Sequence, residues 1–374
     1  MEAIKNIYII DSTLRDGEQA PGVVFSEQEK IHIAQMLDGV GVDEIEAGTP
    51  AMGEDECRII RKISAMNLNA RISVWSRAVK QDILIAAKTG AQGIHIAFPL
   101  SDIQLASMNK EWAMMRDSLP VMVEIAKSYF DYVSVGAQDA SRCRIERLFE
   151  FISMAEELSV RRIRFADTVG ILTPMGIMDL IKKILNRYPH LDIDFHGHND
   201  LGMATANAIT AWQSGASTLS VTVNGLGERA GNSALEEVIM TMLLIEKQNK
   251  YSTSTLYSLC QFVSIAAKRP ISAGKAISGN MVFSHESGIH AKSSLTDINA
   301  FQAFDGKLIG RESSRNLFGK HSGKGAVIDF LNKQHVIIDN AKIDRLMAII
   351  HQMAQTYQRS IYGTEIIEAY WDLE

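Results

Sequence analysis

Short runs of apolar, often β-branched residues recur from residue 7 to residue 223 and alternate with longer segments of helical periodicity. In the longer segments, such as 27–37, 83–88 and 148–158, apolar residues recur at spacings of three and four, which is typical of amphipathic helices. Glycine or proline precedes several of the short runs and ends the helix before it. Eight strands are predicted, at 7–14, 42–47, 70–75, 93–98, 132–136, 162–167, 192–196 and 218–223.

Eight strand–helix units in about 250 residues predict a (β/α)8 barrel, the TIM barrel of the α/β class. The alternative is an open, doubly wound sheet, which expects a glycine-rich turn after the first strand. Here the first strand runs into the polar segment 12–16, so the pattern favours the closed barrel.

The pattern changes beyond residue 249, where a second region is expected. Segment 270–323 is rich in Ser, Gly, Lys and His and has weak periodicity, whereas helical spacing returns at 343–355. We therefore assign residues 1–265 to a catalytic TIM barrel and residues 266–374 to a C-terminal lid and helical subdomain. A polar extension beyond a completed barrel is interpreted as a lid over its mouth or as an oligomer contact.

The chain has 38 basic and 44 acidic residues, a net charge of −6, and no basic tract. This balance argues against a nucleic-acid partner but allows a small anionic substrate, which a few arginines can bind. Cys57, Cys143 and Cys260 are scattered and form no disulfide framework, as expected in a reducing compartment. No signal pattern opens the sequence and no apolar run reaches about 18 residues, so we expect a cytoplasmic protein with no membrane partner.

Polar residues follow the predicted strands at their C-terminal ends, where barrels carry their active sites. His196 and His198 stand two residues apart, so on an extended strand both imidazoles point to the same side. Together with a carboxylate they would bind a divalent ion (Mg, Mn, Zn or Co), with Asp16 and Asn232 as the further candidate ligands. From the residues alone the alternatives stay open: two packing histidines, a helix cap or arginine partner at Asp16, and a turn residue at Asn232.

Other candidate side chains suit an anionic substrate. Arg15 could stabilise an enolate or alkoxide oxygen, or it could form a structural ion pair. Gln19, Arg77 and Thr168 are suited to orient a 2-oxo acid by hydrogen bonds, or they are ordinary polar residues at strand ends. His290 lies in a Gly- and Ser-containing stretch, which favours a mobile segment that supplies a catalytic base over a structural histidine.

Four motifs are similar to those of one enzyme family: 11–19 (DSTLRDGEQ), 196–198 (HGH), 224–232 (NGLGERAGN) and 287–290 (SGIH). Together they resemble the Claisen-condensing barrel family of 2-isopropylmalate, homocitrate and citramalate synthases, and the resemblance covers residues 4–330. Segments 50–53, 74–77 and 136–142 are most similar to the homocitrate synthases of nitrogen-fixing bacteria.

The resemblance implies an acyltransferase that condenses acetyl-CoA with a 2-oxo acid, with 2-oxoglutarate, giving homocitrate, as the expected case. It implies that the oxo acid chelates the metal, that a base removes a methyl proton from acetyl-CoA, and that the enolate attacks before the thioester is hydrolysed. It also implies a homodimer. The implied roles are metal binding by Asp16, His196, His198 and Asn232, enolate stabilisation by Arg15, proton removal by His290, and oxo-acid binding by Glu46, Arg77 and Thr168.

Two positions depart from the family pattern. Gln138 stands where members commonly carry a glutamate that works with the lid histidine, so an amide replaces an acid–base group at this catalytic position. Phe301 lies eleven residues after His290, where homocitrate synthases often have tyrosine. These changes predict weakened deprotonation of acetyl-CoA. The alternatives are a catalytically weakened paralogue that binds a metal–2-oxo-acid complex, an isopropylmalate- or citramalate-type synthase, and an aldolase or lyase of the same barrel.

Overall fold

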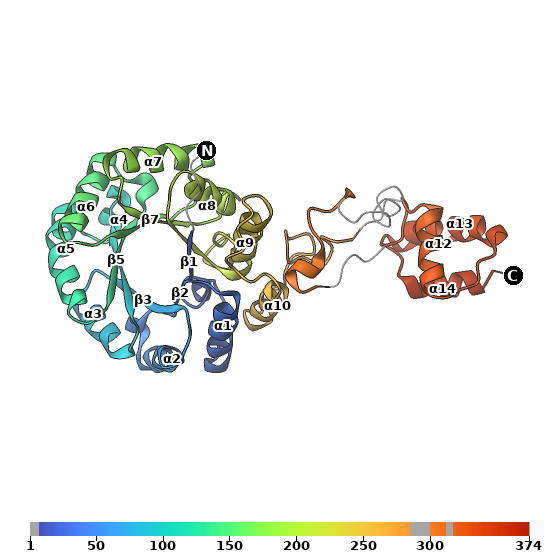
Figure 1. The fold of residues 1–374 in the computed structure, drawn as a ribbon, viewed down its shortest axis with the longest axis horizontal. Helices are drawn as coiled ribbons and strands as arrows, with labels where there is room; N and C mark the ends of the chain where they lie inside the picture. The colour runs from blue at the N-terminus through green and yellow to red at the C-terminus, as the bar shows by residue number, and fades with distance from the viewer. Residues whose placement is uncertain (1–6, 285–299, 312–316, 374) are drawn as a thin grey trace. The chain divides into compact units, whose positions relative to one another are not determined.

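The computed structural model describes residues 7–284, 300–311 and 317–373. The chain divides into two compact units, Met1–Pro270 and Ile271–Glu374. In Figure 1 the strands of the first unit lie within a ring of helices, whereas the labelled elements of the second unit are all helical.

The first unit is a closed barrel of eight parallel strands in the order β1 to β8, and β8 pairs back to β1. Tyr8 lies beside Thr218 in this closing pair. The closure confirms the predicted (β/α)8 fold and excludes an open sheet, whose edge strands would lack one partner. The strands are β1 (Tyr8–Asp11), β2 (Glu44–Glu46), β3 (Arg71–Arg77), β4 (Gly93–Pro99), β5 (Tyr132–Gln138), β6 (Arg162–Asp167), β7 (Asp192–Gly197) and β8 (Thr218–Val221).

Helices form the outer layer, and local sequence sets where they begin and end. The Ser26 hydroxyl accepts a hydrogen bond from the Glu29 amide, while the Glu29 carboxylate accepts one from the Ser26 amide, a capping box that starts α1 (Glu27–Val40). Gly41 ends α1 in the left-handed region, with φ 86°. The other barrel helices are α2 (Glu54–Ser64), α3 (Lys80–Ala86), α4 (Asp102–Ser107), α5 (Trp112–Lys127), α6 (Ile145–Glu157), α7 (Pro174–Arg187), α8 (Ala204–Gln213), α9 (Leu235–Leu244) and α10 (Leu256–Ala266).

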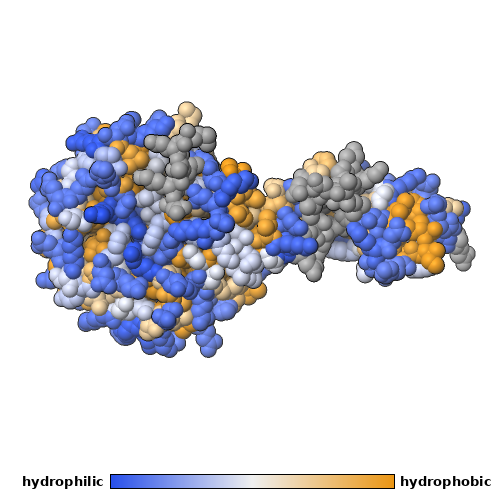
Figure 2. All heavy atoms as spheres, in the orientation of Figure 1, coloured by the Kyte–Doolittle hydropathy of each residue, from blue (hydrophilic) through white to orange (hydrophobic). Residues whose placement is uncertain are grey.

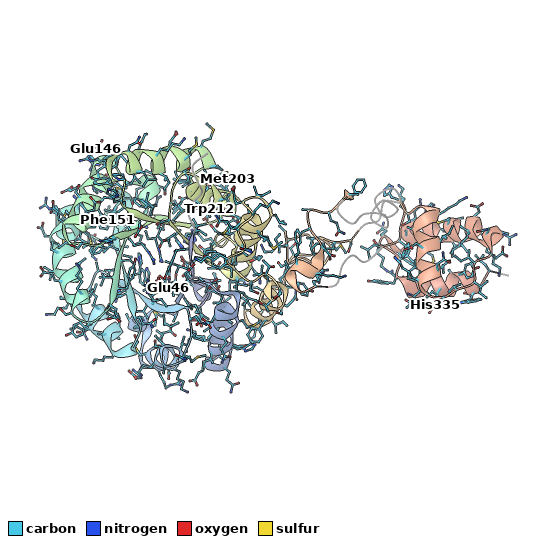
Figure 3. All side chains as sticks on the ribbon, viewed as in Figure 1. Glu46, Glu146, Phe151, Met203, Trp212 and His335 are labelled. Atoms are coloured by element: carbon cyan, nitrogen blue, oxygen red, sulfur yellow. The ribbon has the colours of Figure 1, made fainter. Side chains whose placement is uncertain are left out.

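Charged side chains fill much of the barrel interior in layers. Near the N-terminal ends of the strands, Arg162 donates to Glu44 at 2.8 Å and stacks over two tyrosine rings. One layer higher, Glu46 lies inside the barrel (Figure 3) and accepts from Arg164 at 2.8 Å. The cause is the polar residue at every second position of β2 and at the first and third positions of β6, because alternate strand residues face the interior.

Apolar side chains from the outward strand positions and from the helices make the main core of the first unit. Ile9, Ile45 and Phe165 of the strands are buried, as are Phe151 of α6 and Trp212 of α8, both labelled in Figure 3. Hydrophilic residues cover most of the visible outer surface of the barrel (Figure 2). Among the described residues, no helix combines the length and the apolar character needed to cross a bilayer.

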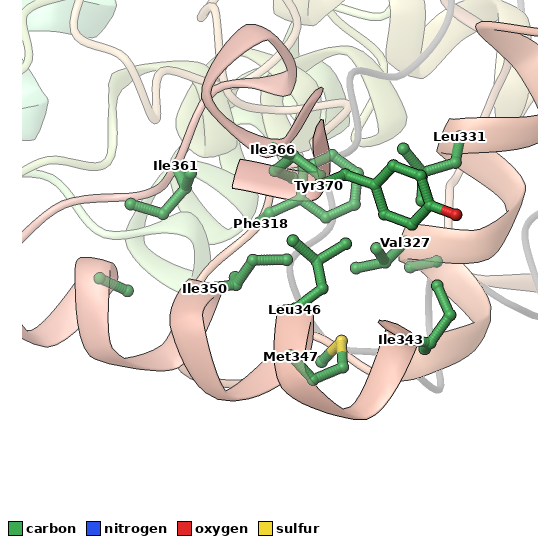
Figure 4. Packing of buried hydrophobic residues seen from close by; sticks show 12 residues of the cluster. Phe318, Val327, Leu331, Ile343, Leu346, Met347, Ile350, Ile361, Ile366 and Tyr370 are labelled. Atoms are coloured by element: carbon green, nitrogen blue, oxygen red, sulfur yellow. The ribbon is translucent and has the colours of Figure 1, made fainter. Parts of the chain in front are cut away.

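The second unit contains α12 (Lys324–Lys333), α13 (Asn340–Tyr357) and α14 (Gly363–Trp371). These helices enclose an apolar core of their own, in which Leu346 and Ile350 of α13 are fully buried (Figure 4). The helical periodicity of 343–355 lies within α13, which confirms a helical C-terminal region. Its role as a lid stays a prediction.

Candidate active site

Side chains from the C-terminal ends of the strands line a cavity of about 400 Å³ in the first unit. This is the end at which (β/α)8 barrels carry their active sites. The lining contains Arg15, Asp16, Gln19, Gln138, Thr168, His196 and His198, all predicted from the sequence, together with Trp75, His95, Ala97, Gly136, Arg164, Ala166 and Glu228.

Asp16, His196 and His198 bring one carboxylate and two imidazoles together in this lining. Their donor atoms all lie within 4.8 Å of one another, and all three residues are buried. The Asp16 Oδ2 atom is 3.0 Å from His196 Nε2 and 4.0 Å from His198 Nε2. Both imidazoles turn toward the same carboxylate, as the spacing of two residues on an extended strand predicts.

The surroundings keep Asp16 and His198 in the protonation states that bind metals. Burial and the neighbouring His196 lower the pKa of His198 to about 4, so its imidazole is neutral at pH 7. Burial alone would raise the pKa of Asp16, but Arg15 and the two histidines hold it well below its usual range. A neutral imidazole and an ionised carboxylate are the forms that ligate a divalent ion.

Asn232 lies beside the Asp16 carboxylate through its amide nitrogen and also carries a buried amide oxygen. Its amide nitrogen donates to Asp16 Oδ1 at 3.3 Å and to the Leu226 carbonyl at 3.1 Å, whereas its buried Oδ1 atom has no hydrogen-bond partner in the described residues. A side chain at Gly227 would overlap the Asn232 amide, so glycine allows this close approach. A buried oxygen without a partner costs free energy, and a cation at this position would remove that cost. The residues present therefore fit a divalent metal.

Arg15 is oriented toward the cavity by three neighbours. Its Nε atom donates to the Glu46 carboxylate, and its Nη1 atom donates to Asp16 Oδ2 at 2.9 Å. The guanidinium carbon lies 5.6 Å from the centre of the Trp75 ring, a cation–π contact. A guanidinium carries five N–H donors in a fixed plane, so donors remain for an anionic oxygen in the cavity.

Gln138 and Thr168 occupy neighbouring strand ends. Gln138 is the last residue of β5 and lines the cavity, and the Thr168 hydroxyl accepts from the Asp139 amide at 2.9 Å. The Asp139 carboxylate turns to Ser101 and Arg142. The acid next to Gln138 is thus engaged elsewhere, as expected for adjacent residues that face opposite ways.

Comparisons with known proteins place this barrel in a family. Residues 6–263 match the model described as HMGL-like, and residues 277–358 match the model described as homocitrate synthase post-HMGL domain-like. The chain belongs to the HMGL-like family.

Relatives of this HMGL-like chain carry several kinds of synthase name. 2-Isopropylmalate synthase 2 of Caldanaerobacter subterraneus is 40% identical over 99% of the chain and 96% of that protein. Homocitrate synthase 1 of Nostoc sp. is 38% identical over 97% of each chain. Homocitrate synthase of Frankia alni is 42% identical over 86% of the chain and 92% of that protein. The predicted family is confirmed, and these names do not single out the nitrogen-fixation type.

Solved structures agree with the fold of the HMGL-like unit. The HMG-CoA lyase of Bacillus subtilis superimposes with a TM-score of 0.66 at 18% identity, covering 72% of this chain and 97% of that chain. At this identity the likeness concerns the fold alone.

Glu46 of the HMGL-like barrel is absent from the cavity lining, so its contact with an oxo acid stays a prediction that the structure does not support. Its side chain is fully buried. One carboxylate oxygen accepts from the Ser12 hydroxyl at 2.6 Å and from Arg15, and the other accepts from Arg164 at 2.8 Å. Burial alone would raise the pKa of Glu46, but the two arginines hold it well below its usual range. Its three charged or polar partners lie within the barrel, which favours a structural role for this carboxylate.

Arg77 also lies outside the cavity lining, so its role in substrate binding stays a prediction that the structure does not support. It stands two residues after Trp75, which lines the cavity, and its own side chain is 64% exposed. Its Nε and Nη2 atoms donate to the Asp82 carboxylate of α3 at 2.6 and 3.1 Å. An acid five residues further along the chain therefore neutralises this arginine.

Trp75, His95 and Arg164 line the cavity although the sequence reasoning did not single them out. His95 Nδ1 lies 2.9 Å from the Ser134 hydroxyl, and burial together with Arg164 lowers the pKa of His95 well below its usual range, so it is neutral. A side chain at Gly136 would overlap the imidazole of His95. The signal that could have found these residues is the period of two along each strand, which marks the inward-facing positions.

His290 lies outside the described residues, so its role as a base stays a prediction. Phe301 belongs to the second unit and is 44% exposed.

Proposed function

We propose that this chain is an acyltransferase that condenses acetyl-CoA with a 2-oxo acid, and that 2-oxoglutarate, giving homocitrate, is the first candidate substrate. The observation that carries the proposal is the placement of Arg15 beside Asp16, His196 and His198 in the lining of one barrel cavity. The synthase names of relatives that cover nearly the whole chain support it. We further propose that the enzyme is a cytoplasmic homodimer, in keeping with the family resemblance.

The 2-oxo acid would bind on the side of the cavity that carries the candidate metal ligands. A divalent ion (Mg, Mn, Zn or Co) held by Asp16, His196 and His198 would supply Lewis acidity toward the keto group of the oxo acid. The buried and unpartnered Asn232 Oδ1 atom would be a further candidate ligand. The Thr168 hydroxyl lies in the same lining and offers a hydrogen bond to the carboxylate of the oxo acid.

Arg15 would act on acetyl-CoA, because negative charge develops on the oxygen of the acetyl-CoA enolate. Its guanidinium is held by Glu46, Asp16 and Trp75 before any substrate enters, so it need not reorganise as charge develops. A preorganised donor of this kind contributes about 3–4 kcal/mol to the stabilisation of a developing oxyanion.

Removal of the methyl proton requires a base, and we propose His290 for this step. Gln138 can hold a substrate or a water by hydrogen bonds but exchanges no proton near neutral pH. Its presence in the cavity lining favours a second candidate function. In that case the chain is a catalytically weakened paralogue that binds a divalent metal and a 2-oxo acid without efficient condensation.

A thiol-release assay tests the proposal. Chelator-treated protein is supplied with acetyl-CoA, with one of 2-oxoglutarate, 2-oxoisovalerate or pyruvate, and with each divalent metal in turn. We expect free CoA thiol with at least one oxo acid, only after metal is restored. Absence of CoA release with every oxo acid would refute the synthase function, and calorimetric binding of the oxo acid would then support the paralogue. Cleavage of 4-hydroxy-2-oxo acids without CoA would instead indicate an aldolase or lyase.

A matched pair of variants assigns the activity to this cavity. Arg15→Lys keeps a positive charge but loses the planar fork that reaches Glu46 and Asp16 together. Arg77→Lys makes the same change at the exposed barrel rim. We expect a large fall in CoA release for the first variant and an unchanged rate for the second.

A further inference from the structure

We propose that Arg164 is a positioning residue that aims Arg15 through Glu46. The inference deepens the proposed function and rests on the role given there to Arg15. Arg164 lies on β6, far along the chain from Arg15, and none of the sequence motifs contains it.

The contacts form a continuous line of buried ionic hydrogen bonds. Arg164 Nη1 donates to one Glu46 oxygen at 2.8 Å, and the other Glu46 oxygen accepts from Arg15 Nε. Arg15 Nη1 then donates to Asp16 Oδ2 at 2.9 Å. These four side chains are each less than 8% exposed. A carboxylate with its two oxygens bonded to two different guanidinium groups has little freedom to rotate, so it fixes the direction of both.

The other end of the line returns to the metal-binding strand. Arg164 Nε donates to Asp194 Oδ2 at 2.6 Å, and Asp194 Oδ1 accepts from the Ser220 hydroxyl at 2.8 Å. Asp194 stands two residues before His196 on β7 and so faces the same side of the strand. Arg164 thereby connects the strand that carries the imidazoles with the arginine beside the Asp16 carboxylate.

The charge balance favours a positioning role for Arg164 over direct substrate binding. Its guanidinium already faces two carboxylates, those of Glu46 and Asp194, so no excess positive charge remains for a further anion. Both partners hold the pKa of Arg164 above its usual value although burial alone would lower it. If Arg164 lost its fork of donors, Glu46 and Asp194 would lack a shared partner inside the barrel. Glu46 would then be held on one oxygen alone, by Ser12 and Arg15, and could rotate about it.

The same strand supplies a matched control. Arg162 stands two residues earlier on β6, faces the same interior, and is likewise buried. It donates to Glu44 at 2.8 Å and stacks over Tyr8 and Tyr132, one layer below the cavity. Replacing either arginine disturbs a buried ion pair in the barrel core, but only Arg164 has a line of contacts to Arg15.

The experiment compares Arg164→Lys, Arg162→Lys, Arg15→Lys and the double variant Arg15→Lys/Arg164→Lys in the full chain. Lysine keeps the charge but cannot bridge two carboxylates with a planar fork. We expect Arg164→Lys to lower kcat by about tenfold or more with little change in KM for the oxo acid. Arg162→Lys should keep kcat even if it melts at a similarly lowered temperature. The double variant should be about as slow as Arg15→Lys alone, because both changes remove the same interaction.

Three other outcomes of this experiment would overturn the proposal. A raised KM at unchanged kcat would make Arg164 a direct substrate contact. An equal loss of kcat in Arg162→Lys would make the effect one of barrel stability, and multiplicative losses in the double variant would make the two arginines independent.

Crystal structures of Arg164→Lys and Arg162→Lys provide a readout that does not depend on turnover. We expect the Arg15–Glu46 hydrogen bond to be lost or reoriented in the first structure and kept in the second. If the unaltered protein releases no CoA, the proposed function fails, while these structures still decide whether Arg164 positions Arg15. An Arg15 side chain that stays in place in Arg164→Lys would refute the positioning role.

Discussion

Asp11 lies at the end of β1 as a buried carboxyl group with few compensating contacts. Its neighbour Ser12 points into the barrel toward Glu46, so Asp11 faces the opposite side. One Asp11 oxygen accepts from the Thr13 amide at 2.9 Å, and the other has no hydrogen-bond partner in the described residues. Burial, together with the nearby carboxylates of Glu236 and Glu46, raises the pKa of Asp11 from 3.8 to about 7.

The sign of the resulting pH dependence follows from this shift. Between pH 4 and pH 7 the folded chain holds a proton on Asp11 that the unfolded chain has released, so raising the pH favours unfolding. Above pH 7 the group is ionised in both states and the full cost persists. The pKa of Asp11 is about three units higher in the folded chain, and each unit is worth about 1.4 kcal/mol. Above pH 7 the buried, ionised Asp11 therefore lowers the free energy of unfolding by roughly 4 kcal/mol.

Asp11→Asn removes this cost because an amide carries no charge, while its oxygen can still accept from Thr13. Any fixed change in hydrogen bonding is the same at both pH values. The stability of the variant relative to the unaltered chain should therefore rise by about 3 kcal/mol from pH 5 to pH 8. Urea unfolding at the two pH values measures this difference. The control variant Asp131→Asn, at an exposed site, should alter the free energy of unfolding by the same small amount at pH 5 and at pH 8. A stability difference for Asp11→Asn that is equal at pH 5 and pH 8 would refute the reasoning.

Three further predictions concern the cavity, the metal and the second unit. Gln138→Glu restores an acid–base group in the lining and should raise the rate of CoA release at least about tenfold; an unchanged rate would exclude a role for a carboxylate there. Gly231→Ala forces a side chain onto the Gly225 carbonyl at φ 94°, which displaces the loop before Asn232 and should weaken metal binding in calorimetry about tenfold, whereas Gly39→Ala, with open space around it, should have no effect. Leu346→Ala leaves a cavity in the core of the second unit and should cost about 2–5 kcal/mol in urea unfolding; a smaller loss would mean that this core collapses around the gap.

The barrel could be predicted because each strand has a strong local signal. The limits of β6, Arg162–Asp167, coincide with the apolar run, whereas β3 and β5 extend two residues further, to Arg77 and Gln138. Each extension ends in a polar residue, Arg77 or Gln138, which apolar patterning cannot assign to a strand. The grouping of Asp16 with the two histidines was also predictable, because all barrel strands present their C-terminal ends to the same mouth.

The roles of Glu46 and Arg77 could not be predicted in the same way, because they depend on which partner each charge meets. Glu46 is neutralised by Arg164, 118 positions away along the chain, a pairing that only the closed barrel creates. Arg77 is neutralised by Asp82, close in sequence, but the same spacing would occur whether or not the arginine faced the cavity. Burial depth decides between contact with a ligand and contact with another side chain, and local sequence does not encode it.

The stacked charges inside this barrel constrain how its sequence can diverge. A single neutral replacement at Glu44, Glu46 or Arg164 leaves an unpaired charge buried in the barrel, at a cost of about 3–5 kcal/mol in stability. Accepted substitutions in these layers should therefore occur as compensating pairs. Gln138 in the cavity lining is uncharged, so it can change without leaving a buried charge unpaired. Descendants of this chain would therefore acquire new substrates by altering the mouth while inheriting the charged interior intact.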